Sequence, residues 1–242
     1  MTGCTILHLL DGAKKARGLT VIIDVFRAFS LECYLYDLGA ALVRPVGSIE
    51  DALALHEKIP GSVLVGERRG IKIEGFDFGN SPSQIKAAAD RIRGRVVIHT
   101  TSAGTQGIIN AEAADEILTG SLVNARAVAQ YIREHAGETG RPVSIVAMGT
   151  SATVPAAEDE LCAEYIEAYV NKKEIPPSFE QRRQDLKFLD GKRFFDPSLS
   201  EHFPEEDYYM CIDMNAFPFV LRVGKDELGF FSEKIPVSCQ ED

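Results

Sequence analysis

Short runs of β-branched and aliphatic residues recur between residues 5 and 148, and segments with helical periodicity separate them. Residues 19–25 and 95–100 are nearly continuous apolar runs, which is typical of strands that are covered on both faces. Ser48 and the residues after it have the pattern of a capped helix between two such runs. The alternation predicts an α/β fold with a mainly parallel sheet and helices on both of its faces.

The same pattern gives approximate bounds for each element. Strands are expected at residues 5–10, 19–25, 41–45, 63–65, 95–100, 114–118, 143–148, 211–213 and 217–223. Helices are expected at residues 30–39, 49–58, 82–92 and 123–135, after residue 103, and from about residue 155 to residue 169. Residues 172–206 are polar and carry four prolines, so we expect an excursion or cap there and not a second catalytic domain. We therefore predict a single α/β domain over residues 1–242.

Charge and cysteine content limit the partners and the compartment. A formal net charge of −10 disfavours binding to nucleic acid or to an anionic membrane surface, because both require a basic surface. No apolar run approaches the roughly 18 residues needed to cross a bilayer. The five cysteines are scattered and odd in number, which indicates reduced thiols in a cytoplasmic protein. They are Cys4, Cys33, Cys162, Cys211 and Cys239.

Residues 63–82 are the most informative stretch for function. A short β-branched run leads into a segment with four glycines between charged residues, among them Glu67 and Arg68. Glycine lets backbone N–H groups approach an anion and allows positive φ in tight turns. Asn80 and Ser81 then precede a proline, which is typical of a helix start, and a helix N-terminus attracts anions. An anion-binding loop is predicted here, and a solvated surface hairpin is the alternative.

Carboxylates and hydroxyls also occur where other expected strands end. Asp24 lies at the end of the run 19–25, where open α/β sheets place their ligand crevice. A second polar loop, residues 100–107, follows a strand in the same way. Glu158 and Asp159 open a later helix, where they either complement the helix dipole or belong to the site.

Several catalytic devices are absent from the sequence. It has no P-loop, no cysteine followed six positions later by arginine, no second aspartate two positions after Asp24, and no Gly-x-Ser-x-Gly motif. The five histidines are isolated, and His99 is interpreted as a packed or hydrogen-bonded residue. The remaining carboxylates are hard oxygen ligands that suit Mg²⁺. Arg27 and Arg68 add forked donors that match phosphate oxygens, so the combination predicts phosphate chemistry.

Four motifs, in this order, resemble those of the 2-phosphosulfolactate phosphatase family. They are Asp-Val-Phe-Arg-Ala at 24–28, Gly-Glu-Arg at 66–68 with Gly-Phe-Asp-Phe-Gly-Asn-Ser-Pro at 75–82, Thr-Thr-Ser-Ala-Gly-Thr at 100–105, and Ala-Glu-Asp at 157–159. The resemblance covers residues 20–165 and extends to residues 211–223. It implies an α/β fold specific to the family and a Mg²⁺-dependent phosphatase that releases sulfolactate from 2-phosphosulfolactate, with a role in coenzyme M synthesis in some lineages. Arg69 stands where glycine is more common in that family.

These observations lead to a hypothesis for a site that acts on a small anionic organophosphate. The residues assigned to catalysis are Asp24, Arg27, Glu67 and Arg68. Those assigned to Mg²⁺ are Asp24, Glu67, Glu158 and Asp159, and those assigned to the substrate are Asn80, Ser81, Thr101, Ser102, Gly104 and Thr105. Two arginines beside a phosphate predict a second anionic group on the substrate, a carboxylate or a sulfonate. The alternative is a regulatory protein that binds an anion on the same fold without turnover, and a homodimer is left open.

Overall fold

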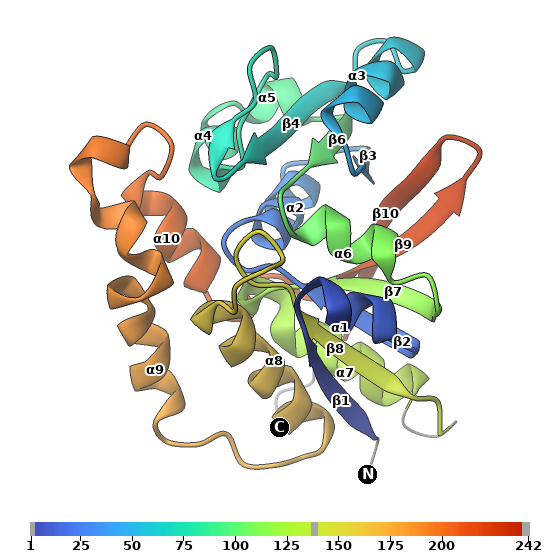
Figure 1. Ribbon diagram of the computed structural model, residues 1–242, viewed down its shortest axis with the longest axis vertical. Helices are drawn as coiled ribbons and strands as arrows, with labels where there is room; N and C mark the ends of the chain where they lie inside the picture. The colour runs from blue at the N-terminus through green and yellow to red at the C-terminus, as the bar shows by residue number, and fades with distance from the viewer. Residues whose placement is uncertain (1–2, 137–139, 239–242) are drawn as a thin grey trace.

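The computed structural model describes residues 3–136 and 140–238, and one sheet of ten strands runs through this part of the chain (Figure 1). The strands are β1 (Cys4–His8), β2 (Gly18–Ile23), β3 (Leu42–Pro45), β4 (Val63–Arg68), β5 (Ile71–Lys72), β6 (Val96–Thr100), β7 (Ala114–Gly120), β8 (Val143–Ala147), β9 (Phe219–Asp226) and β10 (Gly229–Pro236). The α-helices are α1 (Leu9–Lys15), α2 (Ala28–Asp37), α3 (Ile49–Lys58), α4 (Pro82–Ala87), α5 (Ala89–Ile92), α6 (Gly104–Asn110), α7 (Ala125–His135), α8 (Ala157–Val170), α9 (Phe179–Asp185) and α10 (Glu205–Ile212).

The sheet consists of two parallel blocks joined by an antiparallel hairpin. Its order is β1-β8-β2-β7-β9-β10-β3-β6-β4-β5. Strands β1, β8, β2 and β7 pair in parallel, and so do β3, β6 and β4. Strands β9 and β10 pair antiparallel with each other and with the block on either side, and β5 pairs antiparallel with β4. The predicted α/β fold with a mainly parallel sheet is confirmed, and the antiparallel strands make the sheet mixed.

The twist of the sheet brings the two blocks to one site. Three antiparallel pairings separate β7 from β3, so in a flat sheet the blocks would end at opposite edges. Five strand-to-strand steps lie between β2 and β6, and a twist of about 20–25° per step turns one block by roughly 100–125° relative to the other. Both blocks therefore direct the carboxyl ends of their strands toward the centre of the molecule (Figure 1).

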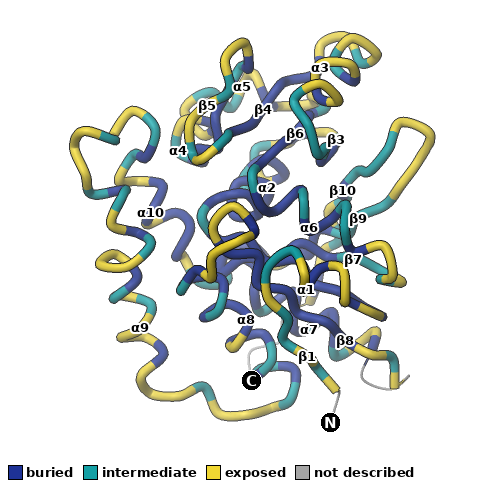
Figure 2. The backbone as a smooth tube through the Cα atoms, in the orientation of Figure 1, coloured by how far each residue is buried: buried dark blue, intermediate teal, exposed yellow. Residues whose placement is uncertain are grey.

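Alternate residues of the strands pack into separate cores. Val21 and Ile23 belong to the cluster with α7 and α8, whereas Ile22 lies between α1 and α6. In the second block, Val65 packs with α2 and α4, and Leu64 packs with α3. Each block is thus covered on both faces, which explains its continuous apolar strands. Figure 2 shows these strands buried at the centre and exposed backbone on α3 and at the tip of the β9–β10 hairpin.

Most expected elements are found close to their predicted positions, including two predicted helix caps. The Ser48 hydroxyl accepts the Asp51 N–H at 3.0 Å and begins α3. Ser81 likewise accepts the Gln84 N–H at 3.3 Å, and the proline after it occupies the first turn of α4. Caps follow from local sequence, which is why they could be predicted.

Four expectations about element bounds are wrong. The single helix expected over residues 82–92 is divided into α4 and α5, which end and begin on either side of Ala88. Strand β1 ends at His8, and residues 9–10, expected in that strand, begin helix α1. Strand β4 does not end at residue 65 but continues to Arg68. Residues 211–213, expected as a strand, include the last two residues of α10. A run of three residues is too short for its periodicity to distinguish a buried strand from a buried helix face.

Residues 172–206 form a series of short helices along one side of the molecule, at the left in Figure 1. Besides α9, this segment contains the 3-10 helices η2 (Leu186–Phe188), η3 (Asp190–Phe195) and η4 (Pro197–Leu199). Its buried side chains, Phe179, Leu186, Phe194 and Phe203, belong to the same cluster as β2. Across residues 3–136 and 140–238, no helix is both long and apolar enough to cross a membrane.

Candidate active site

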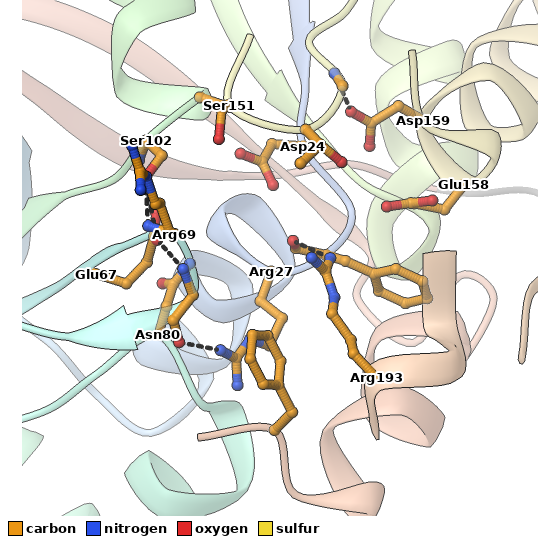
Figure 3. Close-up of a pocket in the computed structure, with 16 residues that line it drawn as sticks. Asp24, Arg27, Glu67, Arg69, Asn80, Ser102, Ser151, Glu158, Asp159 and Arg193 are labelled. Carbon is orange, nitrogen blue, oxygen red and sulfur yellow. Dashed lines mark hydrogen bonds between the residues drawn. The ribbon is translucent and has the colours of Figure 1, made fainter. Parts of the chain in front are cut away.

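A cavity of about 320 Å³ lies where β2, β4, β6 and β8 end (Figure 3). Loops that follow these strands line it, together with the start of α8 and part of the segment 172–206. The lining residues are Asp24, Phe26, Arg27, Glu67, Arg69, Gly70, Asn80, Ser102, Ala103, Gly149, Thr150, Ser151, Glu158, Asp159, Arg193 and Phe203. Open α/β sheets bind ligands at this position, beyond the carboxyl ends of their strands.

Asp24 is held in place by backbone N–H groups. The Ala28 N–H donates to Oδ1 at 3.2 Å, and the Gly104 N–H donates to Oδ2 at 2.9 Å. A Cβ atom on Gly104 would lie 3.0 Å from Oδ2 and 2.9 Å from the Phe29 ring, so glycine is required for this close approach. Burial raises the pKa of Asp24 to about 6, although these N–H groups favour the ionised form.

Glu67 ties the glycine-rich loop to the loop after β6. Its Oε1 accepts the Ser102 N–H at 2.6 Å, and its Oε2 accepts the Gly70 N–H at 2.5 Å and the Ser102 hydroxyl at 3.1 Å. Both carboxylate oxygens of Glu67 therefore hold the two loops together, and the side chain still lines the cavity.

Glu158 and Asp159 line the cavity from the first turn of α8. The Asp159 oxygens accept the Val25 N–H and the Gly149 N–H, both at 2.8 Å. Oε2 of Glu158 is buried and has no hydrogen-bond partner. Burial raises the pKa of both groups well above the usual range, with Asp159 adding to the effect on Glu158 and Asp24 to that on Asp159. The two side chains are 2% and 3% exposed, so they are more than a solvated complement to the helix dipole.

Arg27 lines the cavity, but its guanidinium is committed to the protein. Nη1 donates to Asp207 at 2.7 Å and to the His202 carbonyl at 2.9 Å, and Nη2 donates to the Gly70 carbonyl at 3.2 Å. Asp207 also accepts the Ser81 hydroxyl at 3.0 Å. Arg27 and Ser81, both assigned to the site from sequence, thus meet on a buried carboxylate that joins α10 to the two loops.

Arg68 points away from the cavity, and Arg69 lines it. Because β4 continues past residue 65, Glu67 and Arg68 lie on opposite faces of the strand. The Arg68 guanidinium donates to the Thr100 hydroxyl at 3.0 Å. Arg69 has a φ of 56° and its N–H donates to Ser102 Oγ at 3.1 Å. Strand alternation could have placed Arg68 on the face opposite Glu67, but Arg69 lies in the turn after the strand, where alternation no longer sets the direction of a side chain.

Arg193 is a second lining residue that the sequence did not indicate. It comes from η3, and its Nη2 makes one long hydrogen bond, 3.4 Å, to the Phe26 carbonyl. The surrounding segment has no motif or strand-end position that would have singled it out.

Asn80 lies at the end of a buried chain of polar groups. Its Oδ1 is 2.9 Å from His99 Nε2, and His99 Nδ1 is 3.0 Å from Glu32 Oε1. His99 and Glu32 are fully buried, and neither lines the cavity. The interpretation of His99 as a packed, hydrogen-bonded residue is confirmed.

The loop after β6 uses its backbone donors internally. The Ser102 N–H donates to Glu67 and the Gly104 N–H to Asp24, while Thr101 and Thr105 exchange hydrogen bonds of 3.2 Å between hydroxyls and N–H groups. Of the residues of this loop assigned to the substrate, Ser102 lines the cavity and Thr101, Gly104 and Thr105 lie behind its wall. The backbone N–H groups of this loop were expected to bind phosphate. They hold the carboxylates of Glu67 and Asp24 in position instead.

The sequence is similar to that of a known protein family over most of its length. A family model described as 2-phosphosulpholactate phosphatase matches residues 4–225. The chain belongs to this family.

Three curated relatives, each named probable 2-phosphosulfolactate phosphatase, show how far the similarity extends. The protein of Clostridium acetobutylicum is 40% identical over 155 residues, 63% of each chain, and that of Carboxydothermus hydrogenoformans is 40% identical over 128 residues, 52% of each. The Bacillus subtilis protein is 28% identical over 209 residues, which are 86% of this chain and 88% of the relative. The first two alignments thus span between half and two thirds of the length of those relatives.

The family resemblance implies Mg²⁺, and the cavity has donors that fit this ion. In residues 3–136 and 140–238, no group of three or more His, Cys, Asp or Glu side chains is arranged to hold a metal. Mg²⁺ usually needs only one or two carboxylates, with water and substrate phosphate completing its shell. The unpartnered Oε2 of Glu158 and the nearby carboxylate of Asp24 are hard donors of this kind.

Proposed function

We propose that this protein is a Mg²⁺-dependent phosphatase that hydrolyses 2-phosphosulfolactate to sulfolactate and phosphate. The observation that carries the proposal is the cavity itself, which the carboxylates of Asp24, Glu158 and Asp159 line together with Arg69 and Arg193 (Figure 3). A phosphomonoester bound to a metal ion requires carboxylates for the metal and cationic donors for its oxygens. Membership of the family supports this substrate.

Asp24 and Glu158 would hold the metal ion in this proposal. Asp159 and Glu67 are further carboxylates of the cavity wall, and each, like Asp24, accepts backbone N–H groups with both oxygens. When bound, Mg²⁺ would polarise the phosphate and lower the pKa of a coordinated water.

The chain's own residues bind and orient the substrate. Arg69 and the amide of Asn80 reach the cavity from the glycine-rich loop and offer donors to phosphate oxygens. Asn80 Oδ1 accepts a hydrogen bond from His99 Nε2, so the Asn80 NH₂ group points away from the histidine. Fixed donors of this kind stabilise charge as the ester oxygen leaves.

Phosphate release provides the test. Purified protein is incubated with 2-phosphosulfolactate, with 2-phospholactate and with alkyl phosphates that have no charged group besides the phosphate. Each substrate is tested with Mg²⁺ and with excess EDTA. We expect release from the acidic esters with Mg²⁺ and none with EDTA. Full turnover in EDTA contradicts the metal requirement. Thermal stabilisation by the esters without phosphate release contradicts the enzyme and supports a binding protein.

Three further expectations stay predictions. The free thiols of Cys4, Cys33, Cys162 and Cys211 support a reducing compartment such as the cytoplasm, and Cys239 lies outside the described residues. The route to coenzyme M rests on the family resemblance. A homodimer is to be tested by the mass of the protein in solution.

A further inference from the structure

The arginines that line the cavity differ in whether the protein neutralises them. Arg27 is paired with Asp207 at 2.7 Å. Arg69 and Arg193 have no carboxylate within 4.0 Å among residues 3–136 and 140–238. The carboxylates of the cavity lie beyond ion-pair distance of both guanidinium groups, which therefore remain available to an anionic ligand.

Arg193 has fewer hydrogen-bond partners than its donors could serve. Its Nε is buried and has no hydrogen-bond partner, and its Nη2 makes only the 3.4 Å bond to the Phe26 carbonyl. A buried donor without a partner is unfavourable, so the fold keeps it for a reason. Arg69, by contrast, is exposed and can reach solvent.

Aromatic packing fixes the position of Arg193. Its guanidinium lies 5.2 Å from the Phe203 ring centroid and 5.6 Å from that of Phe194. Phe203 in turn fills the space beside Gly70, where a Cβ atom would be 2.1 Å from the ring. The segment 172–206 is therefore packed tightly against the glycine-rich loop and holds Arg193 at the cavity wall.

The place of Arg193 differs from that expected for the phosphate. Asp24, Ser102 and Arg69 gather on one side of the cavity, whereas Arg193 approaches from the other side beside Phe26 (Figure 3). Arg193 also lines an adjoining hollow that contains Lys192. A group held by Arg193 would therefore be a part of the substrate that extends away from the phosphate.

We propose that Arg193 determines specificity by binding the second anionic group of the substrate, a sulfonate or carboxylate carried near the phosphate ester. This inference rests on the proposed function and assigns the recognition to the segment 172–206. A guanidinium binds either group through two parallel hydrogen bonds, and its terminal nitrogens, of which Nη2 makes only the long bond to the Phe26 carbonyl, would supply the donors.

The first experiment compares kcat/KM for 2-phosphosulfolactate and for an alkyl phosphate that has no charged group besides the phosphate. We expect the native enzyme to prefer the acidic ester by about 10- to 100-fold, the size of one charge-assisted contact. Arg193→Ala should lose most of this preference, mainly through a higher KM for the acidic ester. Arg193→Lys should restore part of it, because it keeps the charge and loses the fork. Arg182→Ala is the matched control, since Arg182 lies in the same segment and pairs with Glu164 at 2.5 Å on the surface.

The second experiment measures binding without turnover. Sulfolactate carries both a carboxylate and a sulfonate but no phosphate, so Arg193→Ala should weaken its binding in calorimetry by about tenfold or more, and weaken the binding of inorganic phosphate much less. Equal losses for both ligands, or on both esters in the kinetic experiment, would overturn the inference. If the native protein releases no phosphate at all, the proposed function fails, while the sulfolactate comparison still decides the role of Arg193. Thermal unfolding of each variant shows that the segment 172–206 remains folded.

Discussion

The carboxylates and the arginines of the cavity are organised in opposite ways. Asp24 and Asp159 accept four backbone N–H groups from the protein's own loops. Arg69 and Arg193, which reach the cavity from different sides (Figure 3), have no carboxylate partner in the described part of the chain. Folding therefore fixes the acceptors and leaves the donors for a ligand. The difference matters because a preorganised carboxylate can hold a metal without rearrangement, whereas a free guanidinium gains its counter-charge only when substrate arrives.

The largest loss of activity should come from changing one of the carboxylates. We expect Asp24→Asn to reduce phosphate release by about 10²- to 10⁴-fold, because the amide keeps the size of the side chain and loses its charge. The new NH₂ group would face the N–H of Ala28 or Gly104, so the free energy of unfolding should fall by ~1–3 kcal/mol. Steady-state kinetics and denaturant unfolding measure the two effects. Normal turnover combined with lower stability would mean that Asp24 only supports the loops.

Replacing Asp207 tests whether Arg27 stabilises the fold or is available to a ligand. Removing one partner of a buried ion pair leaves the other charge unpaired, so Asp207→Ala should lower the free energy of unfolding by ~3–5 kcal/mol. Glu164→Ala breaks an exposed pair with Arg182 and should cost less than about 1 kcal/mol. Urea unfolding of both variants makes the comparison. Similar small losses would place Arg27 with the arginines that are available to a ligand.

The stability of the protein should depend on pH because the carboxylates of the cavity are buried. The pKa of Asp24 rises from 3.8 in the unfolded chain to about 6 in the fold, so between these values the folded protein binds more protons. The free energy of unfolding should therefore fall as pH rises through this window, by up to ~3 kcal/mol. The stability from this group is fully present below pH 3.8 and is lost above about pH 6.

Subtracting the Asp24→Asn curve from the native curve, both measured by urea unfolding in EDTA, isolates this contribution from those of Glu158 and Asp159. Saturating Mg²⁺ should oppose the fall, since metal binding requires ionised carboxylates. A difference between the two curves that stays constant with pH would contradict the raised pKa of Asp24.

Local sequence was sufficient for several parts of the site. The apolar run 19–25 predicted a strand covered on both faces and placed Asp24 at its end. Ser48 was predicted as one cap and Asn80 or Ser81 as another, because a cap depends on the residues within one turn, and Ser81 is the one that caps α4. Asp24, Glu67, Asn80, Ser102, Glu158 and Asp159 were all named from the sequence, and all line the cavity.

What the sequence determined by itself was the set of strands, helices and strand-end carboxylates, because these follow from periodicity over a few residues. Tertiary structure decided which donors face the ligand. Arg69 replaces Arg68 because the pairing of β4 with β6 and β5 carries the strand beyond residue 65. Arg193 enters the cavity because Phe203, distant in sequence, packs against Gly70. The Gly104 N–H binds Asp24 because the twist of the sheet brings the two blocks together, and the Ser102 N–H binds Glu67 because β4 and β6 pair in the sheet. No local pattern specifies such long-range contacts.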